Sequence, residues 1–179
     1  MKKLIVLVLS LVAAVSVSNA QVCALKSNAL YLGIGAVNLG AEFSVAPQWT
    51  VDVSGTAVIF SPWKNVGDGL LYLNGWDAVA EARYYLCKAF NGHHFGGFLE
   101  AARFGDASAH IKGLGNGADL RNVKAGLVGV SYGYYFKLST YWGIDTNIGI
   151  GGGLGTAEGI GKWVFKPVGR AAVSLCYKF

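Results

Sequence analysis

Polar and apolar residues alternate with a period of two on both sides of position 91. In residues 77–86 the two rows are Asp77, Val79, Glu81 and Arg83 against Ala78, Ala80, Ala82, Tyr84 and Leu86. In residues 93–104 Glu100 lies between Leu99 and Ala101, with Phe95 and Gly97 in the uncharged row. This alternation is typical of strands, and Asn91-Gly92 predicts a turn between them. Because ions occupy one face only, we expect that face to line a polar interior and the apolar face to contact lipid.

A helix is the alternative for residues 77–86, because Ala, Glu and Arg are good helix formers. The glycines of residues 93–104 disfavour its extension. The alternation recurs along the chain and predicts strands at 26–35, 39–46, 49–58, 77–86, 93–104, 124–136, 142–151 and 168–179.

The predicted connections differ in length on the two sides of such a meander. Three connections are long, at 59–75, 105–123 and 152–166, and all three would leave the sheet on the same side. The three on the other side are short. Outer-membrane barrels show this asymmetry, and strands of about ten residues are long enough to cross a bilayer at a tilt. The sequence therefore predicts an all-β fold, an eight-stranded antiparallel up-and-down transmembrane β-barrel.

The first 20 residues have the features of a cleaved signal peptide. Met1-Lys2-Lys3 precedes a short apolar stretch, and Ser18-Asn19-Ala20 supplies small residues for cleavage after Ala20. We expect the barrel domain to span residues 21–179. Cys23 raises the alternative of a lipoprotein, but Val22 before it is not small. Export and barrel together predict the outer membrane of a Gram-negative bacterium.

Composition supports a membrane barrel and argues against several other classes. The chain is 53% hydrophobic and only 14% charged, yet residues 21–179 contain no run of the roughly 18 apolar residues that a helical span needs. Without Lys2 and Lys3 the net charge falls from +5 to +3 and is scattered, so no nucleic acid partner is implied. No metal or other cofactor is predicted, since clustered Cys/His spacing is absent. Two of Cys23, Cys87 and Cys176 could form a disulfide, and which two stays open.

The inward rows of the predicted strands collect both signs of charge. They contain Glu42, Asp52, Glu81, Arg83, Glu100, Asp145, Arg170 and Lys178. Unpaired charge in a narrow lumen is very unfavourable, so we expect a network in which Arg83 bridges Glu81, Glu100 or Asp52. Inward glycines such as Gly129, Gly133 and Gly149 would make room for these side chains. Since eight strands leave an interior just filled by side chains, we expect the ions to plug the lumen and not to act in catalysis.

In the last predicted strand, 168–179, small or polar residues alternate with larger apolar ones up to the aromatic residue Phe179. Its outward row is Val173, Leu175, Tyr177 and Phe179. This pattern resembles the C-terminal signal by which barrel-insertion machinery recognises outer-membrane proteins, which makes that machinery and outer-membrane lipid predicted partners. Aromatic residues near strand ends fit interfacial girdles, namely Trp49, Tyr84, Phe95, Phe136, Trp142 and Tyr177.

Several stretches resemble a family of small outer-membrane barrels of unknown function from Bacteroidetes-type anaerobes. They are A-R-Y-Y-L-C-K-A-F-N-G-H-H-F-G at 82–96, N-L-G-A-E-F at 38–43, W-T-V-D-V-S-G at 49–55, G-V-S-Y-G-Y at 129–134 and the final V-S-L-C-Y-K-F. The resemblance implies no active site. Because some members lie beside fimbrial assembly components, it also implies a surface or fimbrial protein partner.

Three functions are compatible with these observations. The first is a non-enzymatic outer-membrane barrel with a structural or surface-interaction role. The second is a lipid-modifying enzyme of the lipid A deacylase or acyltransferase type, for which Asp106, Ser108 and His110 are the triad-like residues, although their spacing in a glycine-rich loop does not define a triad. The third is a soluble lipocalin-like carrier, which would need an apolar interior.

Overall fold

The computed structural model describes residues 22–33, 35–58, 71–109, 118–158 and 161–179. Their elements in chain order are β1 (Cys23–Asn28), α2 (Ala29–Gly33), β2 (Ala36–Ser44), β3 (Trp49–Val58), β4 (Leu71–Tyr85), β5 (Gly92–Ala109), β6 (Ala118–Lys137), β7 (Trp142–Glu158) and β8 (Gly161–Lys178). The proposed signal peptide, residues 1–20, lies outside the described residues. None of the described residues forms a helix long and apolar enough to cross a membrane.

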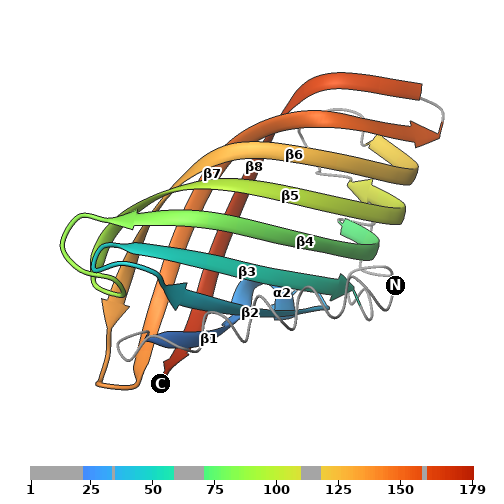
Figure 1. Cartoon of the computed structure of the whole chain (residues 1–179). Helices are drawn as coiled ribbons and strands as arrows, with labels where there is room; N and C mark the ends of the chain where they lie inside the picture. The colour runs from blue at the N-terminus through green and yellow to red at the C-terminus, as the bar shows by residue number, and fades with distance from the viewer. Residues whose placement is uncertain (1–21, 34, 59–70, 110–117, 159–160) are drawn as a thin grey trace, which may run out of the picture.

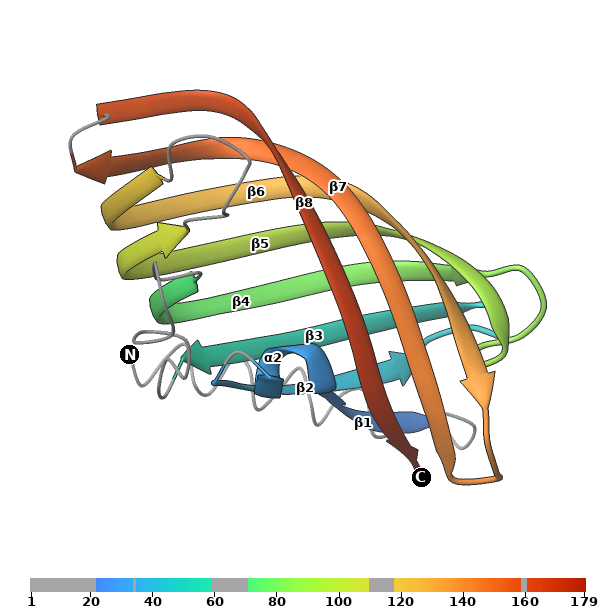
Figure 2. The same cartoon turned by 180° about the vertical axis from the view of Figure 1, so that it is seen from behind.

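The eight strands form one closed barrel in which each pairs antiparallel with the next along the chain. The closing pair is β1 with β8, where Leu25 lies opposite Tyr177. Figure 1 and Figure 2 show the strands wrapping around a common axis, with the C-terminus at the end where the short turns lie. The predicted all-β, eight-stranded antiparallel up-and-down barrel is confirmed.

The two faces of the wall have the polarity that the alternation predicts. Outward side chains such as Leu39, Leu99 and Ile148 are 63–65% exposed. Inward Glu81 and Arg83 are at most 3% exposed. The barrel is therefore apolar outside and charged inside, as in proteins that meet lipid on the outside.

The aromatic residues predicted at strand ends all lie at the end of the barrel that carries the short turns. Trp49, Tyr84 and Phe95 are cross-strand neighbours on β3, β4 and β5. Trp142 and Tyr177 pair in the same way on β7 and β8, with ring centroids 4.9 Å apart. The C-terminal residues Val173, Leu175, Tyr177 and Phe179 lie on the outward side, where Phe179 is 65% exposed. Their part in insertion stays a prediction.

The predicted long connections are wrong in extent. Residues 59–70 and 110–117 lie outside the described residues. Strand β4 takes in residues 71–75 of the first predicted connection, β5 and β6 take in residues 105–109 and 118–123 of the second, and β7 and β8 take in most of 152–166. The glycines there suggested loops, but an antiparallel ladder bonds only backbone groups and so accepts glycine once neighbouring strands are in place. The barrel wall is consequently taller along β4–β8 than along β1–β3, as Figure 1 shows.

The first predicted strand, 26–35, is also wrong beyond Asn28. The chain turns there into α2, and the Asn28 side-chain oxygen accepts a hydrogen bond from the backbone N–H of Leu30 at 3.0 Å. Asparagine favours such local side-chain to backbone bonds, which start helices and turns. Leu30 and Leu32 stay exposed, while Tyr31 lines the cavity inside the barrel.

The turn between β4 and β5 lies two residues before the predicted Asn91-Gly92. Lys88 and Asn91 form an isolated antiparallel β-bridge, so Ala89 and Phe90 are the two residues at the tip of the turn. Phe90 has a positive φ of 61°. The backbone N–H of Ala89 donates to the carbonyl oxygen of Pro47 at 2.9 Å, so this turn is fixed against the β2–β3 turn. Tertiary contact thus decides which residues form the tip.

Candidate functional site

The lumen contains a buried ion network with Lys26 at its centre. The Lys26 ammonium donates to Glu42 Oε2 at 2.8 Å, Asp52 Oδ2 at 2.7 Å and Asp145 Oδ2 at 2.6 Å. These residues come from β1, β2, β3 and β7, so one side chain ties together strands from both sides of the barrel. All four side chains are nearly excluded from solvent.

Arg83 on β4 is the second cation of the network. Its Nη1 donates to Glu42 Oε2 at 3.0 Å and Asp145 Oδ2 at 2.8 Å, and its Nη2 donates to Glu81 Oε2 at 3.0 Å. Nη1 also lies 3.6 Å from Asp52 Oδ2. The planar guanidinium can serve several carboxylates at once, which suits it to a buried site.

Strand register explains why cations are needed at this level. Glu42 lies opposite Asp52, and Asp52 lies opposite Glu81, so three carboxylates stand side by side on β2, β3 and β4. Like charges in such positions repel each other. Lys26 and Arg83 reach across the lumen to them and convert a repulsive row into a paired one.

Neutral groups complete the hydrogen bonding of the carboxylates. Thr50 Oγ1 and Tyr85 Oη donate to Glu42 Oε1 at 2.7 and 2.8 Å. Ser131 Oγ and Asn147 Nδ2 donate to Glu81 Oε1. His94 Nε2 lies 2.9 Å from Asp145 Oδ1, and since a carboxylate only accepts, this nitrogen carries the hydrogen. Buried charge is tolerated when it is both paired and hydrogen-bonded in this way.

The structure brings most of the predicted lumen residues together. Glu42, Asp52, Glu81, Arg83 and Asp145 form the network, and Arg170 Nη1 lies 3.6 Å from Glu81 Oε2.

Two of the predicted residues lie elsewhere. Glu100 is farther along the lumen and forms no ion pair with a described residue, so of the three expected partners of Arg83 only Glu81 and Asp52 are found. Lys178 lies at the rim where β8 ends, half-exposed and without an ion pair to a described carboxylate. Both sit in inward rows but at other heights, which alternation cannot distinguish.

Two network residues were missed by sequence reasoning. Lys26 alternates with outward Leu25, and His94 alternates with outward Phe95, so period two could have placed both inside. Lys26 stands at the first position of the predicted strand 26–35, and the alternation that supports that strand lies beyond Asn28, where the chain is helical. His94 follows His93 directly after the predicted turn, which suggests a position at the rim of the barrel and not in the buried network.

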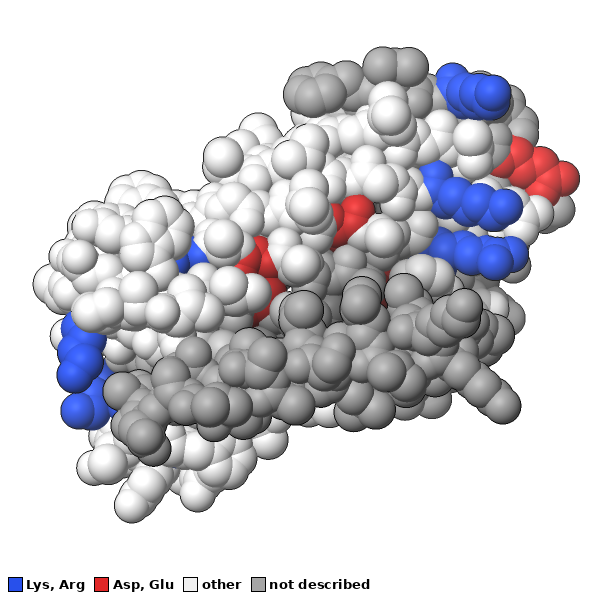
Figure 3. Space-filling model, in the orientation of Figure 1, with Lys and Arg blue, Asp and Glu red and all other residues white. Residues whose placement is uncertain are grey.

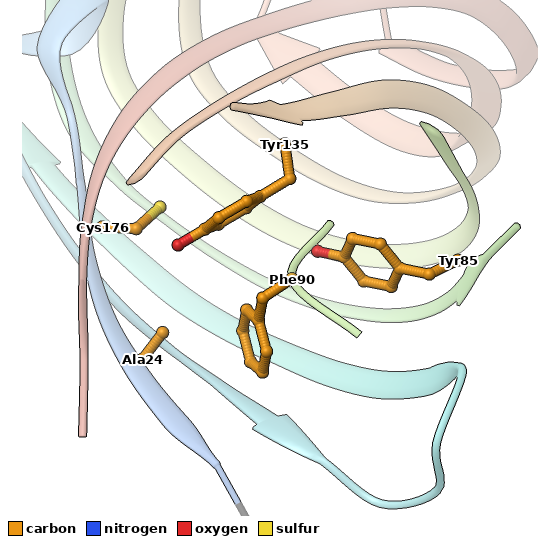
Figure 4. Close-up of a cluster of buried hydrophobic side chains, with 5 residues drawn as sticks. All are labelled: Ala24, Tyr85, Phe90, Tyr135 and Cys176. Atoms are coloured by element: carbon orange, nitrogen blue, oxygen red, sulfur yellow. The ribbon is translucent and has the colours of Figure 1, made fainter. Parts of the chain in front are cut away.

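An aromatic plug closes the lumen between the network and the rim that carries the short turns. The plug is formed by Ala24, Tyr85, Phe90, Tyr135 and Cys176. Figure 4 shows the ring of Phe90 entering from the β4–β5 turn between Tyr85 and Tyr135. Its ring centroid lies 5.8 Å from that of Tyr135 in an edge-on arrangement and 6.2 Å from that of Tyr85. Ring pairs at such distances are favourable beyond simple burial.

On the other side of the network the described lumen side chains leave little space. The cavity lined by Lys26, Tyr31, Asp77 and Arg170 has a volume of about 20 Å³. That is room for about one water molecule. This cavity therefore has no room for a substrate-sized molecule.

Inward glycines make this packing possible. A Cβ at Gly129 would meet the ring of Phe98, one at Gly133 would meet His94, and one at Gly149 would meet Arg170. The prediction that these glycines make room for the charged lumen side chains is confirmed at Gly149, which faces Arg170, and not at Gly129 or Gly133. The neighbours include two that the charge pattern did not identify, Phe98 and His94.

We expect Gly133→Val to destabilise the barrel by about 1–3 kcal/mol, because its Cβ would collide with both His94 and the backbone oxygen of Thr146. The free energy of unfolding in a urea titration of the detergent-solubilised protein measures this. Gly126→Val, also on β6, is the matched control, since nothing lies within 4 Å of a Cβ there. Equal stability of the two variants would contradict the packing argument.

The remaining candidate chemistry does not form a site among the described residues. Cys23, Cys87 and Cys176 are all free thiols, so the open disulfide prediction is answered in the negative. No group of three or more His, Cys, Asp or Glu in the described ranges could hold a metal ion. Asp106 and Ser108 lie on β5 and not in a loop, and His110 lies outside the described residues.

Comparison with known proteins agrees with the resemblance found in the sequence. No curated protein matches the chain. The structure is similar to the crystal structure of Neisserial surface protein A (NspA), with 14% sequence identity, a TM-score of 0.48, and coverage of 89% of this chain and 94% of that one. A family model described as "Protein of unknown function (DUF3575)" matches residues 4–158. The chain therefore belongs to the DUF3575 family.

Proposed function

We propose that the protein is a non-enzymatic outer-membrane β-barrel of a Gram-negative bacterium with a structural or surface-interaction role. The observation that carries this proposal is the inverted polarity of the wall. Leu39, Leu99, Val130 and Ile150 are 63–65% exposed, whereas Glu42 and Asp145 are buried inside. In water the apolar rows would lose the benefit of burial, whereas acyl chains suit them.

The closed lumen argues against a role as a general pore. Lys26 and Arg83 tie opposite walls together, and Phe90 fills the space below them. Eight-stranded barrels typically have an interior filled by side chains. Function is then carried by the outer wall or by the ends of the barrel, where a surface or fimbrial partner remains a prediction from the resemblance alone.

The two alternative functions gain no support from the geometry. A lipocalin-like carrier needs an apolar cavity, whereas the described interior of this barrel contains a network of charged side chains. A lipid-modifying enzyme needs a nucleophile with its base, and no described contact supports one: Asp106 and Ser108 are placed only by their backbone on β5, and His110 lies outside the described residues. We therefore do not propose either.

Cell fractionation and conductance test the proposal together. We expect the full chain in the detergent-extracted outer membrane, with faster gel mobility before heating than after, and no steady conductance steps in a planar bilayer. Recovery in the soluble periplasm would contradict the membrane assignment. Stable conductance steps would contradict the closed lumen while leaving the location intact.

A further inference from the structure

One row of outward residues crosses the wall near the end opposite the short turns. Trp76, Arg103, Lys124, Thr156 and Lys162 are successive cross-strand neighbours on β4, β5, β6, β7 and β8. We call these five residues the basic belt. The same row continues to Ala57 on β3 and Val37 on β2, which are uncharged. The positive charge is thus confined to one arc of the wall.

All five side chains of the basic belt are exposed, and Trp76 is 49% exposed. No described carboxylate lies within ion-pair distance of Arg103, Lys124 or Lys162. Glu158 on β7 lines an outer groove together with Arg103, Lys124 and Thr156, and its carboxylate accepts a hydrogen bond from Asn122 Nδ2 at 2.9 Å. Figure 3 shows blue side chains gathered at this end of the barrel, with a red group among them.

The height of the belt matches a membrane boundary. Arg103 is eight residues along β5 from Phe95, and Lys124 is eight along β6 from Tyr132, both in the aromatic row near the other rim. Eight residues rise about 26 Å along a strand, or about 20 Å along the barrel axis at a tilt of about 40°. The apolar band of such barrels is about 25 Å tall. The register shifts of β4 and β6 follow directly beyond the belt, as is common at barrel rims.

Two outer grooves connect the belt with the apolar wall. A groove of about 750 Å³ lies along the belt itself, and a second of about 600 Å³ lies below it. They share Ala101, Gly126 and Leu154. These shared residues are all apolar, and two of them are small, so an elongated apolar chain could lie against the wall directly beneath the cations.

We propose that the basic belt binds the phosphate group of a lipid in the outer leaflet, with an acyl chain in the groove below. This rests on the proposed membrane location. Arg103 can bind a phosphate through two N–H groups, and Lys124 and Lys162 add point charges on either side. Trp76 suits the boundary between headgroups and acyl chains. Charge complementarity with a phosphorylated headgroup explains why three cations stand unpaired on an otherwise apolar face.

The test uses the full barrel reconstituted in phosphatidylcholine nanodiscs that contain a small fraction of lipid A carrying two phosphates. Native mass spectrometry then counts the lipid A molecules that the barrel retains. The belt variant R103Q/K124Q/K162Q is compared with K88Q/K137Q/K178Q, which removes the same charge at the opposite rim. We expect the belt variant to lose affinity about tenfold or more, the rim variant to bind as the wild type does, and dephosphorylated lipid A to be poorly retained.

Three outcomes would overturn the proposal. The first is equal retention of lipid A by the belt variant and the wild type, and the second is equal retention of phosphorylated and dephosphorylated lipid A. The third is displacement of the lipid by millimolar inorganic phosphate, which would identify a site for free anions. Gel mobility before and after heating confirms that each variant is folded, and the single variants R103Q and K124Q replace the triple if it is not. Because lipid retention is measured in vitro, its failure is separate from a failure of outer-membrane location in cells.

Discussion

Replacing Arg83 with methionine is expected to destabilise the folded barrel by about 3–5 kcal/mol, because breaking a buried ion pair leaves the partner charges uncompensated. Arg83 donates to Glu42, Glu81 and Asp145 from a position that is 3% exposed. Without it, four buried carboxylates share Lys26 and the more distant Arg170. The folded fraction during a urea titration in detergent, read from heat-modifiable gel mobility, measures the loss.

Arg103→Met is the matched control for Arg83→Met, since Arg103 lies on the outer face and has no ion pair with a described residue. A second variant separates charge from packing. Combining Arg83→Met with Glu81→Gln removes one carboxylate, and we expect the pair of changes to cost less than the sum of the two single changes. Equal stability of the Arg83 and Arg103 variants would show that the network does not hold the walls together.

Phe90→Ala is the second large effect, expected to cost about 3–5 kcal/mol. The Phe90 side chain is 3% exposed and is held between Tyr85 and Tyr135, so truncation leaves a cavity that the surrounding strands cannot close. The same urea titration measures the effect. A smaller loss is expected for Phe95→Ala, whose ring is 49% exposed on the outer face. If the two variants unfold at the same urea concentration, Phe90 is not a plug.

The fold was predictable because alternate residues of each strand face either the polar lumen or the apolar exterior, and their side chains differ accordingly. The alternation of Thr50 and Asp52 with Val51 and Val53 predicts the strand Trp49–Val58 at its observed bounds. The ionic row of residues 77–86 likewise predicts which face is buried. The period of two is a local property of consecutive residues, so it can be recognised without knowing which strands are neighbours.

The candidate site was predictable in part. Alternation places Glu42, Asp52, Glu81, Arg83 and Asp145 inside, but it carries no information about height along the barrel axis. Glu100 shares a face with His94 on β5, yet His94 joins the network and Glu100 does not. Only the register between strands decides which inward residues meet.

The sequence by itself determined the strand period, the polarity of the two faces and the meander order, because these depend on residues near each other in the chain. The tertiary structure alone decided that Asn28 ends β1 in a helix, that glycine-rich segments extend β7 and β8, and that Phe90 enters the lumen. The last two outcomes depend on pairing or packing with a distant strand, and the Asn28 side chain that caps the helix locally also accepts a hydrogen bond from the backbone N–H of Val173 on β8. The closed cylinder also aligns Trp76, Arg103, Lys124, Thr156 and Lys162 into one row, a juxtaposition that arises only once the strands are in register.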